Sequence, residues 1–167
     1  MMSKIPDLEQ QVDEPSLALP VTPLARDSLA ILVTSLAARL NRGATAYYQK
    51  NFGIGMAEFR IVLALGRNQT LNIGEVAIAA EVDKAMASRS LRTLELRGLV
   101  QLQQTSTRGR AAIAQLTPQG QQLEQAIRQA AQRREQKLIA TLTASEIEAA
   151  NALLYKLVDR VAHMNKD

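Results

Sequence analysis

Residues 83–98 read DKAMASRSLRTLELRG, and this stretch holds the signals for the start, the buried face and the end of one helix. Asp83 suits the N-cap position, where its carboxylate accepts hydrogen bonds from the amides of the first turn. Gly98 suits the position just after a helix, because glycine adopts the left-handed conformation there without strain. The apolar residues between them recur at spacings of four and three and predict one buried face: Ala87, Leu91 and Leu94.

A different face of this helix carries small and cationic side chains: Ala85, Ser88, Arg89 and Arg92. Small residues allow a helix to approach the floor of a DNA major groove, arginines reach guanine edges or phosphates, and serine bonds to either. A half-buried surface helix of any soluble protein can carry similar solvated arginines. The flanking sequence therefore has to distinguish a DNA-reading helix from an ordinary surface helix.

The composition predicts one soluble, helix-rich chain and excludes several kinds of chemistry. Aromatic residues make up only 3% of the 167 residues, and alanine and leucine are abundant. The absence of cysteine excludes disulfides, thiolate zinc sites and thiol catalysis. The single histidine, His163, excludes a multi-histidine metal site within one chain. We therefore expect no metal and no cofactor, and an enzyme is disfavoured because no nucleophile with a base and no phosphate-binding glycine loop is present.

Neither a membrane segment nor a secretion signal is evident. No stretch approaches the roughly 18 apolar residues that a membrane span needs. The first residues, MMSKIPDLEQ, reach acidic side chains before any apolar run, unlike a signal peptide. We expect a cytoplasmic protein without membrane contact.

Positive charge is concentrated around the 83–98 stretch. Residues 1–23 hold one lysine and four acids, so the net charge of +4 divides into −3 there and +7 over residues 24–167. Between positions 84 and 110, Glu95 is the only acid among six basic residues: Lys84, Arg89, Arg92, Arg97, Arg108 and Arg110. This clustering and a pI near 9.7 are typical of nucleic-acid-binding proteins, although a basic solvated surface gives the same net positive charge.

The chain before residue 83 divides into an arm and three predicted helices. Four prolines and scattered acids make residues 1–23 a flexible N-terminal arm. Apolar residues at helical spacing then predict a long helix from Leu24 to about Lys50 and a second helix from Met56 to about Arg67. In that second helix, the apolar face is expected to hold the following residues: Phe59, Val62, Leu63 and Gly66.

A third, short helix precedes the 83–98 stretch. Asn72 and Glu75 have the spacing of a capping box and predict a helix from Asn72 to Ala80. A tight turn at residues 81–82 then leads into Asp83. Two short helices joined in this way, the second with a cationic face, predict a helix-turn-helix.

A hairpin is predicted directly after Gly98. Two runs that can form strands, about 100–105 and 111–116, flank a polar tip with a glycine. A basic hairpin after a helix-turn-helix is a wing, which can lay Arg108 or Arg110 along a minor groove or a phosphate strand. The alternative is an exposed loop that charge keeps soluble.

Two long helices are predicted at the C-terminal end. Thr117 and Pro118 suit the N-cap and first position of a helix that runs to about Leu142. Thr143 and Glu146 form a further capping box, which opens a last helix over about 144–164. Such helices expose more apolar surface than one chain covers, so we expect residues 24–50 and 118–164 to form a homodimer interface. The predicted fold is mainly α with a small β-hairpin wing: a winged helix-turn-helix at 51–117 flanked by dimerisation helices.

Three stretches in fixed order make the chain resemble the MarR family of bacterial transcription regulators, winged-helix dimers that bind pseudo-palindromic DNA: AEFRIVLALGRN, GEVAIAAEVDKAMASRSLRTLELRGLV and RGRAAIAQLTPQG. The resemblance covers about residues 29–164. It implies that Ser88 and Arg89 contact DNA and that Arg110 reaches the minor groove. One departure concerns the wing, where Arg108 replaces the family's usual acid and Thr105-Ser106-Thr107-Arg108 replaces its Asp-Pro-x-Asp tip. The acid normally helps to hold the wing arginine, whereas the added charge strengthens phosphate attraction.

The resemblance also implies a ligand cleft between the dimerisation helices and the winged helix. Four of the five aromatic residues gather at the junction of the first two predicted helices: Tyr47, Tyr48, Phe52 and Phe59. They either line a site for a small aromatic or organic-acid effector, or pack as core and hinge residues. Arg39 or Arg60 is the possible counter-charge, and Arg60 is alternatively a structural ion-pair partner.

The predicted function is sequence-specific binding of double-stranded DNA by a homodimer that acts as a ligand-responsive transcriptional repressor. The expected DNA contacts are Lys84, Ala85, Ser88, Arg89, Arg92, Arg108 and Arg110. The alternative is a winged-helix module that binds protein without specific DNA binding. The small cationic face disfavours that alternative, because protein-binding faces are rich in aromatic and aliphatic anchors.

Overall fold

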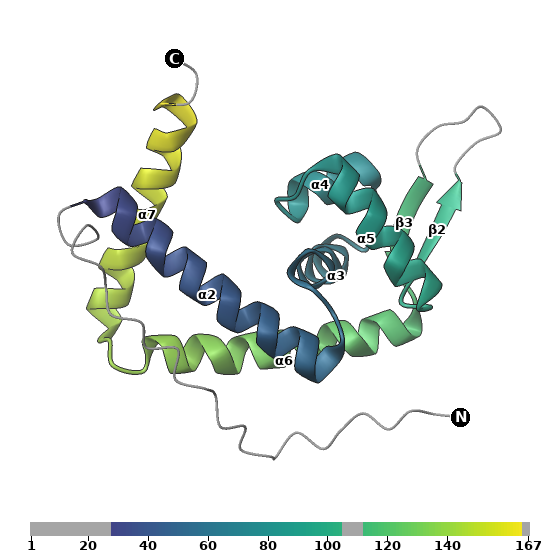
Figure 1. The fold of residues 1–167 in the computed structure, drawn as a ribbon, viewed down its shortest axis with the longest axis horizontal. Helices are drawn as coiled ribbons and strands as arrows, with labels where there is room; N and C mark the ends of the chain where they lie inside the picture. Colours follow the sequence, from purple (N-terminus) through teal and green to yellow (C-terminus); the bar gives the residue numbers. More distant parts are fainter. Residues whose placement is uncertain (1–27, 105–111, 165–167) are drawn as a thin grey trace. The chain divides into compact units, whose positions relative to one another are not determined.

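The computed structural model describes residues 28–104 and 112–164. By internal contacts the chain forms two compact units, residues 1–42 and 43–167, and each is described by itself. The described elements (Figure 1) are, in order, α2 (Leu29–Phe52), α3 (Met56–Asn68), β1 (Thr70–Asn72), α4 (Ile73–Ala79), α5 (Lys84–Leu96), β2 (Val100–Gln104), β3 (Ala112–Leu116), α6 (Pro118–Ile139) and α7 (Ala144–Met164).

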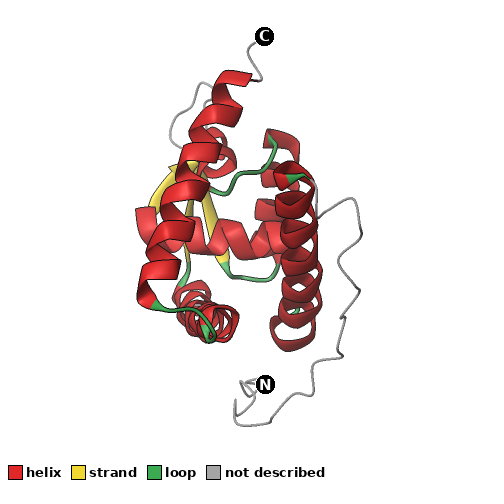
Figure 2. Ribbon diagram, turned by 90° about the vertical axis from the view of Figure 1, so that its left-hand side faces the viewer, coloured by secondary structure: helices red, strands yellow, loops and turns green. Residues whose placement is uncertain are grey.

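The chain is mostly helical, with one small antiparallel sheet (Figure 2), which confirms the predicted fold class. Strands β2 and β3 form the predicted hairpin, in which Val100 pairs with Leu116 and Leu102 pairs with Ala114. The third strand, β1, was not predicted. It pairs with the other edge of β3, so the strand order is β1-β3-β2.

The long helix α2 begins later than its apolar pattern predicts and runs from the first unit into the second. Ser28 is not helical, and its backbone carbonyl accepts the first helical hydrogen bond from Leu32 at 3.0 Å. The predicted start at Leu24 is therefore wrong, and residues 24–27 lie outside the described part of the chain, as does the N-terminal arm. At the other end, the helix continues past Lys50 to Phe52.

The second unit has a core made by α3, α4, α5, α6 and the sheet. Side chains with almost no exposure include Ile54, Ile61, Val62, Leu65, Val76, Leu91, Leu94 and Ile127. The predicted apolar face of α3 was partly wrong. Phe59 and Leu63 are only half-buried and Gly66 is exposed, whereas Ile61 and Leu65 are buried.

Polar caps fix the ends of the helices around the sheet, as their sequence signals predicted. Asn72 and Glu75 form the capping box of α4. The Thr117 hydroxyl accepts a hydrogen bond from the Gly120 amide at 3.0 Å and donates one to the Gly98 carbonyl at 2.7 Å. Thr117 therefore starts α6 and also fixes the chain just after α5.

Candidate nucleic-acid interface

Helix α5 points its cationic face to solvent because the core takes up its apolar face. The side chains of Ala87, Leu91 and Leu94 are fully buried, as predicted. The five predicted contacts in this helix are all exposed: Lys84, Ala85, Ser88, Arg89 and Arg92. Four of them, from Ala85 to Arg92, follow the spacing of a single helical face.

The start of α5 is held by its cap and by the turn after α4. The Asp83 carboxylate accepts a hydrogen bond from the Met86 amide at 2.7 Å. The Val82 amide donates to the Ala77 carbonyl at 3.0 Å, which closes the turn between the two helices. Glu81 within this turn has a φ of 52°, a conformation that non-glycine residues seldom adopt. The helix-turn-helix geometry is therefore fixed by contacts of the chain itself.

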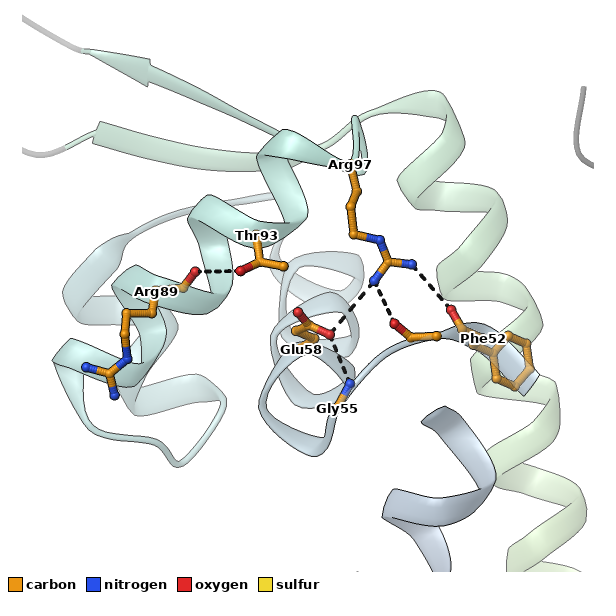
Figure 3. Close-up of polar contacts among 7 residues, drawn as sticks. Phe52, Gly55, Glu58, Arg89, Thr93 and Arg97 are labelled. Atoms are coloured by element: carbon orange, nitrogen blue, oxygen red, sulfur yellow. Dashed lines mark hydrogen bonds and ion pairs between the residues drawn. The ribbon is translucent and has the colours of Figure 1, made fainter. Parts of the chain in front are cut away.

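The arginines at the two ends of α5 have different surroundings. Figure 3 shows Arg89 in the first half of the helix and Arg97 just past its end, aimed at the connection between α2 and α3. Arg97 Nη1 donates a hydrogen bond to the Gly53 carbonyl at 2.9 Å. The sequence assigned Arg97 only a place in the basic cluster, whereas the structure shows that its side chain binds the protein's own backbone.

The wing is described only in its strands. Strands β2 and β3 are paired up to Gln104 and Ala112. The tip between them lies outside the described residues, together with Arg108 and Arg110. The predicted minor-groove contacts and the effect of the altered tip stay predictions.

Comparisons with known proteins agree with this arrangement. A family model described as "MarR family" matches residues 52–111. A MarR/EmrR family transcriptional regulator from Acinetobacter sp. ADP1 superposes with a TM-score of 0.74 at 27% identity, over 85% of this chain and 99% of that chain. Residues 52–111 therefore match the MarR family, and the chain has the winged-helix fold of a MarR/EmrR family transcriptional regulator. The family and its structural neighbours are transcriptional regulators, not enzymes.

Two further solved structures share the fold of this chain. MepR of S. aureus, solved as a DNA complex, has a TM-score of 0.72 and 21% identity, over 80% of this chain and 98% of that chain. BpsR of Bordetella bronchiseptica, whose DNA binding is regulated by 6-hydroxynicotinic acid, has a TM-score of 0.66 and 23% identity, over 76% and 98% of the two chains. No curated protein sequence matches the chain.

The aromatic residues singled out in the sequence form one cluster. The Tyr48 and Phe59 rings stack with centroids 4.1 Å apart, and Tyr47 meets Tyr48 edge-on at 5.4 Å. The Arg134 guanidinium lies over the Tyr47 ring, 5.0 Å from its centroid. Tyr48 is only 3% exposed and belongs to the core. The packing alternative therefore describes Tyr48, while an effector-binding role of the cluster stays a prediction.

Burial also changes the acidity of Tyr48. Removal from water raises the pKa of its hydroxyl above the ordinary value of 10.0; the Arg134 charge lowers it, and Tyr47 raises it further. The hydroxyl is thus a neutral group at physiological pH. Arg39, the predicted counter-charge, lies half-buried on α2 in the first unit, and its role as a counter-charge stays a prediction.

Arg60 is an ion-pair partner within the fold, which is one of the two roles that the sequence left open. Its Nη1 lies 3.9 Å from Glu81 Oε2 and 3.5 Å from the Glu81 carbonyl oxygen. It therefore braces the turn before α5. Arg60 and Arg67 also line an open hollow of about 500 Å³ between α3 and the end of α4, which no sequence signal predicted.

Two other classes of site are absent from the described residues. No group of three or more histidine, cysteine or acidic side chains there could hold a metal ion. Among the helices from α2 to α7, none combines the length and apolar character that crossing a bilayer requires.

Proposed function

We propose that this regulator binds double-stranded DNA sequence-specifically as a homodimer and acts as a ligand-responsive repressor on a pseudo-palindromic operator. The observation that carries the proposal is the exposed face of α5, small and cationic, on a helix with a buried opposite face. Small residues permit close approach to base pairs, and the arginines attract phosphates and guanines.

The roles of the α5 residues follow from their positions and chemistry. Ser88 and Arg89, in the first half of the helix, are assigned to base reading. Lys84 and Arg92 supply mainly sequence-independent attraction to phosphates. In a dimer, two such helices would enter successive major grooves roughly 34 Å apart, which matches an inverted repeat.

Exposed apolar side chains on α2 and α7 support the homodimer. They recur at helical spacing on both helices and include Leu29, Leu32, Leu36, Leu40, Leu154, Val158 and Val161. A row of exposed leucines and valines on a soluble protein marks an interaction surface. A second copy of the same chain is the partner that symmetric assembly favours.

The effector part of the proposal rests on the aromatic cluster and on a structural neighbour. BpsR is regulated by 6-hydroxynicotinic acid, a small aromatic acid. Tyr47, Phe52 and Phe59 are half-buried rings around the buried Tyr48, and Arg134 beside Tyr47 offers positive charge. A small aromatic or organic acid would lower DNA affinity by the difference in its affinity for two dimer states. Acting on chromosomal DNA, the protein would work in the cytoplasm.

Selection of tight-binding duplexes from a random pool tests the DNA part of this proposal. We expect an inverted repeat with half-sites about one helical turn apart and a steep dependence of affinity on salt. Arg89→Ala should weaken binding to the selected duplex by about tenfold or more and relax the preference at one base pair. Arg67→Ala removes an exposed arginine of α3 instead and is the matched control.

The rival function is a winged-helix module that binds a protein partner. It would give no consensus motif and weak affinity for every duplex, and Arg89→Ala would not differ from Arg67→Ala. That result would refute the base-reading roles of Ser88 and Arg89.

A further inference from the structure

The side chain of Arg97 reaches from the end of the recognition helix α5 to the end of helix α2 (Figure 3). Its Nη1 donates to the Gly53 carbonyl at 2.9 Å, and its Nη2 lies 3.4 Å from the Phe52 carbonyl as a second donor. These residues are 44 and 45 positions apart in the sequence. One guanidinium thus links two helices that are far apart in the sequence.

Of the two carbonyls that Arg97 binds, that of Phe52 is a group that a helix end leaves without a helical partner, and that of Gly53 follows directly after the helix. The last four carbonyls of an α-helix have no amide one turn ahead to bind, and the helix dipole makes this end negative. Phe52 is the last residue of α2, and Gly53 follows in the left-handed conformation, with a φ of 64°. A planar cation with two parallel donors suits this place, so Arg97 acts as a C-cap supplied from another helix.

The same guanidinium also lies near the start of α3. Glu58 Oε2 is 3.9 Å from Arg97 Nη1 and accepts the Gly55 amide at 2.9 Å. The side chain of Glu58 is 16% exposed and that of Arg97 is 36% exposed. Arg97 therefore contacts the end of α2, the connection and the capping carboxylate of α3, partly shielded from solvent.

The backbone of Arg97 is itself fixed to the end of α5. Its amide donates to the Thr93 carbonyl at 3.2 Å, and the next two amides close the turn onto Glu95 and Leu94. The Thr117 hydroxyl holds the Gly98 carbonyl from the other side. A displacement of Phe52 and Gly53 would thus pull directly on the last turn of the recognition helix.

We propose that Arg97 is a positioning residue: it fixes α5 to the α2–α3 connection and transmits any movement of the C-terminal end of α2 to the DNA-reading helix. This inference rests on the proposed function for its effect on DNA binding. The bridge itself is a property of the free protein, so the two can be tested separately.

Amide hydrogen exchange of the DNA-free protein tests the bridge. In Arg97→Gln, we expect faster exchange in peptides covering residues 53–58 and in the last turn of α5, because both lose a shared partner. Arg92→Gln removes a similar charge from the same helix and should leave both regions as in the unchanged protein. Equal exchange in Arg97→Gln and Arg92→Gln would overturn the proposal.

Salt titration with the selected duplex tests the consequence for DNA. A positioning residue makes no phosphate contact, so Arg97→Gln should lower affinity by about three- to tenfold without changing the salt slope. Arg92→Gln should lower affinity and reduce the slope by about one. Arg97→Lys keeps the charge but not the paired donors, and should fall between Arg97→Gln and the unchanged protein.

The outcomes separate this inference from the proposed function. A salt slope reduced in Arg97→Gln as in Arg92→Gln would make Arg97 a phosphate contact and overturn its positioning role. If the unchanged protein binds no duplex, the proposed function fails, and the exchange comparison still decides whether Arg97 joins α5 to the α2–α3 connection.

Discussion

The winged helix and α7 differ in how far their apolar side chains are buried. In the winged helix, four large apolar side chains of α3 and α5 are buried almost completely: Ile61, Val62, Leu91 and Leu94. In α7, none of the described side chains is buried, and Leu153 and Val158 are 61% and 66% exposed. Both segments have amphipathic sequences, but only the apolar face of the winged helix packs against other apolar side chains of the described chain.

This difference separates what folds the protein from what assembles it. Burial of apolar surface stabilises by about 25 cal/mol per Å², and the winged helix obtains this stabilisation within one chain. A helix such as α7 is marginal alone in water, because its stability comes mainly from packing of its apolar face. Substitutions in the two regions should therefore affect different measurements: the free energy of unfolding in one, and association in the other.

The largest expected effect is at Gly120, in the first turn of α6, where this helix packs against Leu99 of the winged helix. A Cβ atom at this position would lie 1.9 Å from the Leu99 carbonyl oxygen, which is a backbone atom. That oxygen is already held by the Thr117 amide at 3.1 Å and has little room to move. We expect Gly120→Ala to lower the free energy of unfolding by about 3 kcal/mol, measured by urea denaturation.

Gly55 provides the matched control for Gly120. A Cβ there would meet nothing within 4 Å, and the φ of −82° is ordinary for any residue. Gly55→Ala should therefore change the stability by no more than about 0.5 kcal/mol. Equal stability of the two variants would show that α6 can shift away from Leu99 at little cost.

The second prediction concerns the exposed face of α7. Leu154→Glu should weaken dimerisation by at least about 3 kcal/mol, because symmetry places the unpaired charge in the interface twice. The winged helix should stay folded, since its core lies within one chain. Sedimentation equilibrium measures the association, and circular dichroism measures the folding.

Lys156→Glu is the control on the same helix. Its position is about half a turn away from Leu154, so the charge change should not fall on the apolar face. An unchanged monomer–dimer equilibrium in Leu154→Glu would mean that α7 is not the dimer interface. The exposed residues of this helix would then need another partner.

The sequence predicted the elements whose signals are local. A cap with its carboxylate or hydroxyl lies within a few residues of the amides that it binds, so Asp83, Asn72 and Thr117 identified the starts of three helices. The buried face of α5 followed from its period, because a helix repeats every 3.6 residues. The exposed position of its cationic residues followed from the same period.

Features that depend on distant residues were missed. Strand β1 has only three residues, too few for an alternating pattern, and it forms because β3 offers an unpaired edge. Nothing within α3 shows that Gly66 leaves room for Glu124 of α6, whose carboxyl group would lie 2.7 Å from a Cβ there. Glu124, buried and paired with Arg128, appears in the sequence as an ordinary surface acid. Arg97 was likewise counted as one charge among six.

A third prediction tests the strained turn of the winged helix. Glu81 adopts a φ of 52°, which is costly for a β-branched residue and free for glycine. Glu81→Val should therefore be about 1 to 2 kcal/mol less stable than Glu81→Gly in thermal unfolding. Both substitutions remove the Arg60–Glu81 ion pair and keep the Glu81 carbonyl that Arg60 also binds, so their difference reports mainly on the backbone conformation. Equal stability would mean that the turn relaxes to another conformation.

The smallest expected effect is at Tyr48, the one buried residue of α2 and the place where that helix enters the core. The folded protein keeps the Tyr48 proton to a higher pH than the unfolded chain, whose tyrosine pKa is 10.0. Unfolding then releases this proton above pH 10, so the stabilisation is complete below pH 10 and is lost as the pH rises through the folded pKa. Denaturation at a series of alkaline pH values should show a shallower decline in Tyr48→Phe.

Tyr155 supplies the comparison on the exposed side of the molecule. Its side chain lies on α7 and the residue is 73% exposed, so Tyr155→Phe should decline with pH as the unchanged protein does. If Tyr48→Phe and Tyr155→Phe follow the same curve, α2 is not anchored in the core at Tyr48. The stable core would then begin only at α3. Helix α2 would resemble α7, whose apolar side chains are exposed in the single chain.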